Sequence, residues 1–399
     1  MALRIIPFFS SISPESVKDE VLDHFSVTKT KIIEPNDFKF ENATDRNYLF
    51  IGTGGTENDV AEFLAKYSLT PPVIILSYDS RNSLPAAMEI RSYLQHEGIE
   101  AKIVHHSLPE LVRMVSDWCD FIEILAQIRE STIGIVGQPS SWLIASAIDI
   151  DKVKKRWGLT TKQLNLDTLI ESAKSNGNTD YINSFKESSI SCGPSDEELR
   201  KAGLVAQALN DLVHQHKLNA VSVECFSLLM ETSVSGCFAL SLLNDQKEST
   251  AGCEGDIPAT FTMMLGRMLT GQIGFMSNVT QINREENSAV FAHCTLPITL
   301  AERYEITSHF ETGLSIGIRG TFKLQPVTIF KVFGEDLSEY WVSEGEIIEN
   351  LVNETGCRTQ IRVKLDESVD YFLERSLANH HIVFTGRHAE RIRKFFSFA

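Results

Sequence analysis

The sequence predicts an α/β protein with two doubly wound parallel-sheet domains, followed by a C-terminal, mostly antiparallel β domain. Three observations support this prediction. The chain has 399 residues, which is long enough for two or three domains. Its first part alternates short apolar runs with amphipathic ones, a pattern typical of parallel sheets covered by helices. Beyond residue 310 short alternating runs are separated by glycine and charged turns, which indicates antiparallel strands.

We expect the N-terminal α/β domain to cover residues 1–160. Its expected strands lie at 3–9, at the start of 48–67, and at 71–79, 101–107 and 131–139. Its expected helices run over 14–25, the end of 48–67, and 84–97. The glycine turn GTGGTEND (52–59) lacks the lysine of a phosphate-binding loop and the spacing of a dinucleotide fingerprint, so it is only a weak indication of nucleotide binding.

A second α/β domain is expected over residues 161–300. A polar stretch, 151–193, is predicted to form helices and a connection between the domains. Ser195 then begins a long helix with two glutamates in its first turn, as the helix dipole prefers. A strand at 218–226 and a helix near 236–243 lead to the segment GCEGDIP (252–258). The C-terminal domain, 301–399, ends with a strand at 381–386 and a helix at 388–396.

The segment GCEGDIP places two carboxylates where a strand passes into a helix. Asp256 is in position to cap that helix, Pro258 suits its first turn, and Gly271 is expected to end it. Glu254 has no such structural explanation. It follows the carboxyl end of a predicted strand, where open α/β sheets bind their ligands.

Two further predicted strands also end in polar side chains. In the run GQIGFMSNVTQI (271–282) the predicted strand ends at Asn278, and in SAVFAHCTLP (288–297) the predicted strand ends at His293. Three successive strand ends thus offer Glu254, Asn278 and His293, and the pattern predicts that they share one cleft.

Composition excludes several classes of protein. The net charge is −16, with 53 acidic and 37 basic residues, which argues against nucleic acid as a partner. Seven scattered cysteines without a CxxC pair favour neither disulfides nor a structural zinc site. The N-terminus does not look like a signal peptide and no stretch is apolar enough for a membrane span. We therefore expect a cytoplasmic protein with no membrane partner.

Several segments resemble the L-fucose isomerase and L-arabinose isomerase superfamily, and most of all its shorter fucose isomerase-related members. They are GCEGDIPATFTMMLGRMLTG, FMSN, FAHCTLP and SLANHHIVFTGRH, while GIVGQPSSWLIAS and NSLPAAMEI resemble recurring segments of the shorter members. The resemblance implies a fucose isomerase-like fold, a homo-oligomer (trimer or hexamer), and a divalent ion, usually Mn²⁺. It also implies aldose–ketose isomerisation of a small-molecule sugar through an enediol, with the metal as Lewis acid.

The resemblance implies roles for particular residues. Glu254 matches the first carboxylate ligand, His293 a histidine ligand of the arabinose branch, and His380 a C-terminal histidine ligand. Asn278 falls where a second carboxylate ligand is expected, and its amide oxygen makes it a candidate neutral ligand of the ion. Because an amide cannot accept a proton, either the ion is held more weakly, Asp256 supplies the missing acid/base group, or the chemistry differs. The candidate catalytic residues are therefore Glu254, Asp256 and Asn278.

Three further residues are candidates for substrate binding. The resemblance places His309 and Glu311, in SHFETG, beside the substrate pocket, although a solvated turn is an equally good interpretation. Trp142 is a candidate for stacking on a sugar, with packing as the alternative. Two other functions stay open: a sugar epimerase that uses the same cleft, and a non-catalytic or regulatory sugar-binding protein that lost its second carboxylate.

Overall fold

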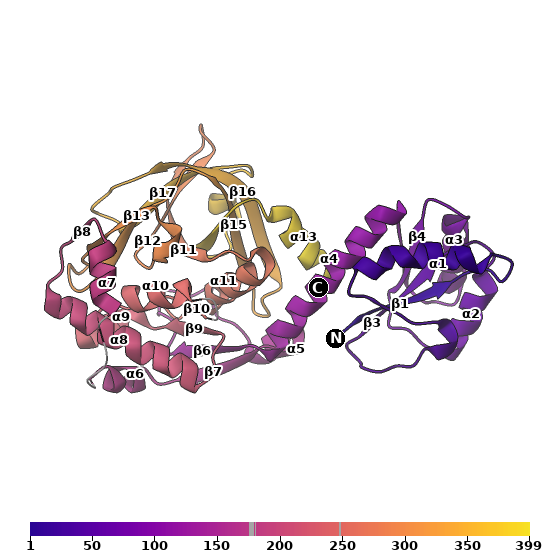
Figure 1. Ribbon diagram of the computed structural model, residues 1–399. Helices are drawn as coiled ribbons and strands as arrows, with labels where there is room; N and C mark the ends of the chain where they lie inside the picture. Colours follow the sequence, from indigo (N-terminus) through magenta and orange to yellow (C-terminus); the bar gives the residue numbers. More distant parts are fainter. Residues whose placement is uncertain (175–178, 180, 247–248) are drawn as a thin grey trace. The chain divides into compact units, whose positions relative to one another are not determined.

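The computed structural model describes residues 1–174, 179, 181–246 and 249–399. The chain divides into two compact units, residues 1–126 with 398–399, and residues 127–397. The expected kinds of sheet are present, since the described residues form two parallel sheets and an antiparallel barrel (Figure 1). The division into three domains at residues 160 and 300 stays a prediction. Residues 175–178 and 180, in the predicted connection, lie outside the described part.

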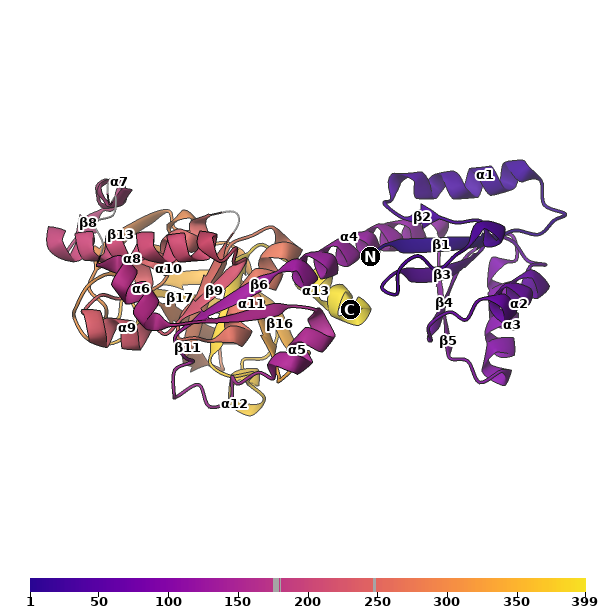
Figure 2. The same ribbon diagram turned by 90° about the horizontal axis from the view of Figure 1, so that it is seen from below.

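The first unit is a parallel sheet with helices on both faces. Its five strands follow the order β2 (Lys31–Ile32), β1 (Leu3–Phe8), β3 (Arg46–Ile51), β4 (Val73–Tyr78) and β5 (Ala101–His106). The helices α1 (Glu15–Asp23) and α4 (Leu108–Glu130) pack on one face, and α2 (Glu57–Lys66) and α3 (Ser83–His96) on the other (Figure 2). Because both faces are covered, the inner strands β1, β3 and β4 are largely apolar and buried.

The second unit begins with a four-stranded parallel sheet. Its strands follow the order β10 (Thr250–Gly252), β9 (Ala220–Val223), β6 (Thr132–Val136) and β7 (Thr160–Leu164). The helices of this part are α5 (Ile150–Trp157), α6 (Leu166–Ala173), α7 (Tyr181–Ser188), α8 (Asp196–Gln215), α9 (Cys225–Thr232), α10 (Cys237–Asp245) and α11 (Ile257–Thr270). The predicted start of α8 is confirmed, since Ser195 and Glu198 form a reciprocal capping box.

A closed antiparallel barrel forms the rest of the second unit. Its strands follow the order β11 (Gly274–Asn283), β12 (Ser288–His293), β17 (Thr359–Leu365), β16 (Glu339–Asn350), β15 (Pro326–Phe333) and β18 (His380–Thr385). A small sheet of β14 (Gly317–Thr321), β13 (Arg303–Thr307) and β8 (Ser191–Cys192) accompanies it. The two remaining helices are α12 (Tyr371–Glu374) and α13 (Ala389–Phe398).

Helix α11 joins the parallel sheet to the barrel. It contacts β9 and β10 on the sheet and β11, β15 and β18 of the barrel. Nearly all its residues are buried, which explains why the segment is apolar on every side rather than along one stripe. Its predicted boundaries are confirmed: Asp256 is the N-cap, and Gly271 ends the helix in a left-handed conformation.

The strands around Asn278 and His293 differ from the prediction. Both β11 and β12 belong to the antiparallel barrel, and β11 continues five residues past Asn278 to Asn283. Asn278 therefore lies in the middle of a strand rather than at its end. The prediction was wrong here because the polar residues that follow Asn278, Thr280 and Gln281, are exposed residues of an antiparallel strand and do not mark a turn.

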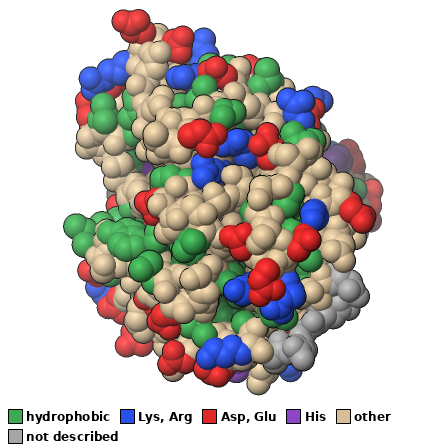
Figure 3. Space-filling model, turned by 90° about the vertical axis from the view of Figure 1, so that its left-hand side faces the viewer, with side chains coloured by type: hydrophobic (Ala, Val, Ile, Leu, Met, Phe, Trp, Pro, Cys, Tyr) green, Lys and Arg blue, Asp and Glu red, His purple; other side chains and the backbone are tan. Residues whose placement is uncertain are grey.

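Charges are mixed on the surface of the second unit. On the face shown in Figure 3, acidic and basic side chains are interspersed. None of the helices in the described part of the chain has both the length and the apolarity that a membrane span requires.

Candidate metal and active site

Glu254 lies in a short backbone segment with left-handed conformation, and its side chain is buried within the second unit. Glu254 and Gly255 both have positive φ, at +63° and +68°. A Cβ on Gly255 would lie 2.6 Å from the Cα of Pro139, so glycine is required there. Two backbone hydrogen bonds hold the segment, from Gly255 to Val223 at 3.0 Å and from Ser140 to Glu254 at 2.8 Å. A non-glycine residue in this conformation is strained, a feature concentrated at functional sites.

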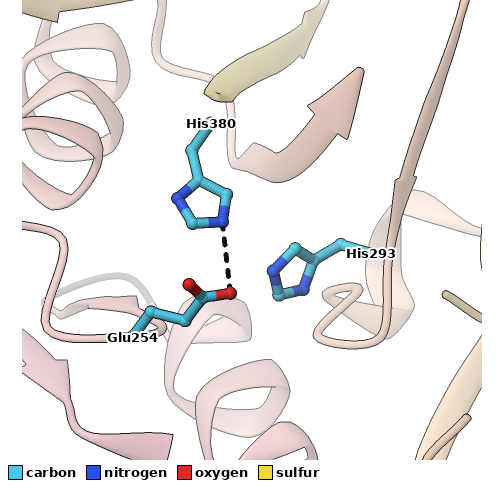
Figure 4. Close-up of side chains that lie close together, drawn as sticks. All are labelled: Glu254, His293 and His380. Carbon is cyan, nitrogen blue, oxygen red and sulfur yellow. Dashed lines mark ion pairs between the residues drawn. The ribbon is translucent and has the colours of Figure 1, made fainter. Parts of the chain in front are cut away.

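Glu254, His293 and His380 converge from three separate elements. Glu254 follows β10, His293 is the last residue of β12, and His380 is the first residue of β18. One ligand atom from each lies within 4.8 Å of the others, and all three side chains are buried. His380 Nε2 lies 3.5 Å from Glu254 Oε1, and the two imidazole centroids are 5.7 Å apart (Figure 4). The fold thus brings together residues 39 and 126 positions from Glu254 along the chain (293 − 254 and 380 − 254).

Asp256 orients His380. Its Oδ1 accepts the backbone N–H of Ala259 as the helix cap, at 2.8 Å. Its Oδ2 accepts a hydrogen bond from His380 Nδ1, also at 2.8 Å, and both side chains are fully buried. Because Nδ1 donates to Asp256, Nε2 is directed toward Glu254, and this buried atom has no hydrogen-bond partner among the described residues. A carboxylate behind a histidine is the usual support of a metal ligand.

The protonation states of the four groups differ strongly. Burial would raise the pKa of Glu254, but His380 and Trp142 hold it below its usual value. Burial likewise opposes ionisation of Asp256, yet the Lys331 charge and the His380 hydrogen bond lower its pKa to about 2. For His380 the effect of burial is outweighed by the two carboxylates, which raise its pKa to about 9. Burial and the neighbouring His380 lower the pKa of His293 to about 4.

These residues fit a divalent ion. One ionised carboxylate and two imidazoles are suitable ligands for a borderline cation such as Mn²⁺ or Zn²⁺. At neutral pH His293 is neutral and keeps a lone pair. His380, whose pKa is raised to about 9, carries a proton on its buried Nε2, and an ion bound there would displace that proton.

Asn278 lies beside this cluster. On β11 it pairs with His380 of β18 and with Ala292 of β12. Its side chain lines the same cavity as Glu254 and His293, and its Oδ1 accepts a hydrogen bond from Asn379 Nδ2 at 3.1 Å. The structure thus places Asn278 beside Glu254 and His293, as the sequence pattern predicted.

The three substrate-binding candidates also lie near the cluster. The Trp142 indole Nε1 donates to Glu254 Oε2 at 2.7 Å, a contact that its sequence context does not reveal. His309 is buried against the Phe226 ring, with ring centroids 5.9 Å apart, and lines the cavity together with Glu311. Trp142 is 52% exposed, so it is not the packed core residue that the alternative interpretation supposed.

The cavity has a volume of about 130 Å³ and a partly apolar wall. Glu254, Asn278, His293, His309 and Glu311 supply its main polar groups. Five of the seven cysteines line the rest of it with apolar side chains, and all are free thiols: Cys225, Cys237, Cys253, Cys294 and Cys357. A confined space with a few convergent polar groups is typical of a small-molecule site.

Sequence reasoning missed one charged residue near the site. Lys331, on β15, is fully buried, and its Nζ lies 3.9 Å from Asp256 Oδ2. A lysine in the apolar run PVTIFKVF was the available signal, because lysine is almost never fully buried unless it is paired.

Comparison with known proteins points to sugar isomerases. No family model matches the chain. It is 23% identical over 226 residues to the sulfoquinovose isomerase of Priestia aryabhattai, covering 53% of this chain and 49% of that protein. The enzymes of the same name from Alkalicoccus urumqiensis (20% over 178 residues, 43% and 40% covered) and Clostridium sp. strain MSTE9 (27% over 126 residues, 31% and 26% covered) are also similar. The chain therefore spans about half the length, or less, of these curated relatives, and its similarity to sugar isomerases extends over that part.

Proposed function

We propose that this chain is a metal-dependent aldose–ketose isomerase acting on a sugar or a sugar derivative. The main support is the buried cluster of Glu254, His293 and His380, of which Glu254 and His293 line a cavity suited to a small molecule. The partial similarity to sulfoquinovose isomerases supports the same class of reaction. The resemblance to the fucose isomerase superfamily supports Mn²⁺ as the ion and a homo-oligomeric assembly.

In this proposal Glu254, His293 and His380 hold the ion. When bound, it supplies Lewis-acid polarisation of the sugar C1 and C2 oxygens. Glu254 is ionised at neutral pH, because His380 and Trp142 hold its pKa below the usual value, and it accepts the carbon-bound proton. Asn278 donates its amide hydrogens to a substrate hydroxyl, a role that needs no charge. Asp256 orients His380 from behind.

The test is a panel of aldoses and ketoses, including sulfoquinovose, assayed after chelation and again after Mn²⁺ is restored. We expect the as-purified protein to interconvert at least one aldose–ketose pair. Conversion should stop on chelation and return with Mn²⁺, because the ion polarises both oxygens of the reacting carbons. Products are identified by NMR, which also separates isomerisation from epimerisation. Failure to convert any member of the panel with Mn²⁺ present would rule out the isomerase proposal.

One observation favours a second candidate, a non-catalytic sugar-binding protein. Asn278 stands where a second carboxylate is expected, and an amide binds a cation more weakly than a carboxylate. We expect Asn278→Asp to tighten Mn²⁺ binding by about tenfold or more, since it adds a negative charge at the cavity wall. The measurement is Mn²⁺ titration by electron paramagnetic resonance, paired with the sugar panel.

The activity of Asn278→Asp then separates the two candidates. An isomerase that uses Asn278 to bind substrate should lose activity when the amide hydrogens are removed. A protein that has lost catalysis should instead gain isomerisation that the wild type lacks. Asn283→Asp on the same strand is the matched control, and it should alter neither ion binding nor activity.

A further inference from the structure

Lys331 is a buried charge that the packing of the barrel does not require. It belongs to β15, where its neighbours Phe330 and Val332 are fully buried apolar residues. Its Nζ has no hydrogen-bond partner among the described residues, and lies 6.0 Å from the centroid of the Phe333 ring. Burying an ammonium group carries a desolvation cost of several kcal/mol, which a methionine of similar volume would avoid. An electrostatic role would explain why a lysine is present.

The charge of Lys331 is connected to the metal-binding cluster through one carboxylate. Its Nζ is 3.9 Å from Asp256 Oδ2, the same oxygen that accepts the hydrogen bond from His380 Nδ1. At this distance Lys331 does not form a hydrogen bond with Asp256, and the carboxylate is already anchored by Ala259 and His380. Lys331 therefore acts on Asp256 through its charge, not by orienting the side chain.

The positive charge of Lys331 opposes the binding of a cation at the cluster of Glu254, His293 and His380. Lys331 and Asp256 are both fully buried, so water screens their charges poorly. Asp256 makes His380 a stronger ligand through its negative charge, and Lys331 partly neutralises that charge. Lys331 also repels a divalent ion bound at His380 Nε2. None of the described residues that line the cavity is a lysine or an arginine, so Lys331, which lies outside the cavity beside Asp256, is the ammonium group placed to have this effect.

We propose that Lys331 lowers the affinity of the site formed by Glu254, His293 and His380 for its divalent ion, and so keeps that ion exchangeable. The inference rests on the ion site of the proposed function, but not on the reaction. The inference predicts the sign of the change in ion affinity: removing the charge of Lys331 tightens ion binding. A purely structural lysine would have the opposite effect, because a disturbed barrel would hold His380 less well.

The test compares Mn²⁺ dissociation constants of full-length variants after chelation, by electron paramagnetic resonance or calorimetry. Lys331→Met, which keeps the volume and removes the charge, should bind Mn²⁺ roughly tenfold more tightly than the wild type. Lys331→Arg, which keeps the charge, should return the wild-type dissociation constant. Lys364→Met on β17 removes an exposed charge of the same unit and should leave it unchanged.

The outcomes separate this inference from the proposed function. Weaker or unchanged Mn²⁺ binding by Lys331→Met, with a wild type that binds the ion, overturns the role of Lys331 alone. A wild type that binds no divalent ion overturns both. A wild type that binds Mn²⁺ but converts no sugar removes the isomerase proposal and leaves the inference standing on its dissociation constants. Thermal denaturation verifies folding, and Lys331→Gln replaces Lys331→Met if that variant does not fold.

Discussion

Glu254→Gln is expected to lower isomerase activity by at least ~100-fold, because it removes the ionised group that we assign as proton acceptor. It also removes the only carboxylate of the three clustered ligands, so Mn²⁺ binding should weaken at the same time. The shape of the side chain is kept, and the Trp142 indole still has an oxygen to which it can donate. The measurements are steady-state isomerisation at saturating Mn²⁺ and a Mn²⁺ titration of the same preparation.

Glu346→Gln is the matched control for this variant. Glu346 lies on β16 of the same unit and is exposed, so its replacement should change neither activity nor ion binding. If Glu254→Gln retains wild-type turnover, Glu254 is not the base. If turnover falls but the Mn²⁺ dissociation constant is unchanged, Glu254 acts on the proton without being a ligand.

Asp256→Asn is expected to lower both stability and ion affinity. The change leaves Lys331 as a buried charge without its counter-ion, which costs about 3–5 kcal/mol of unfolding free energy. It also replaces the carboxylate that fixes the orientation of His380, an effect worth roughly 10–100-fold in metal affinity. Chemical denaturation of the ion-free protein measures the first effect, and Mn²⁺ titration measures the second.

Asp149→Asn provides a matched control because Asp149 is also a helix N-cap, on α5, and accepts two backbone N–H groups. Asparagine caps helices about as well as aspartate, and Asp149 is partly exposed, so little stability should be lost. Ion binding should not change. A wild-type Mn²⁺ dissociation constant for Asp256→Asn would show that the Asp256–His380 hydrogen bond does not support the ligand.

The sequence by itself determined the kinds of local structure. Apolar runs between glycine turns predicted the strands of the first unit, and Ser195, Asp256 and Gly271 marked helix ends that the structure confirms. These features depend on neighbouring residues, since caps and left-handed glycines satisfy backbone groups within one turn. The alternation of apolar and polar residues beyond residue 310 is also a local feature. It predicted antiparallel strands because side-chain direction reverses at each residue of a strand.

The meeting of Glu254 with His380 was predicted from a resemblance, but its geometry depends on the tertiary fold. Only the closed barrel places β18 beside β11, and only α11 sets Asp256 behind His380. No local pattern distinguishes β11 and β12 from strands of a parallel sheet, so Asn278 was placed at a strand end when it lies in mid-strand. The contact of Trp142 with Glu254 and that of Lys331 with Asp256 join residues 112 and 75 positions apart (254 − 142 and 331 − 256). Such contacts arise when whole helices and strands pack together. Charge interactions and hydrogen bonds between distant residues produce no periodic pattern in the sequence, so the sequence alone does not reveal them.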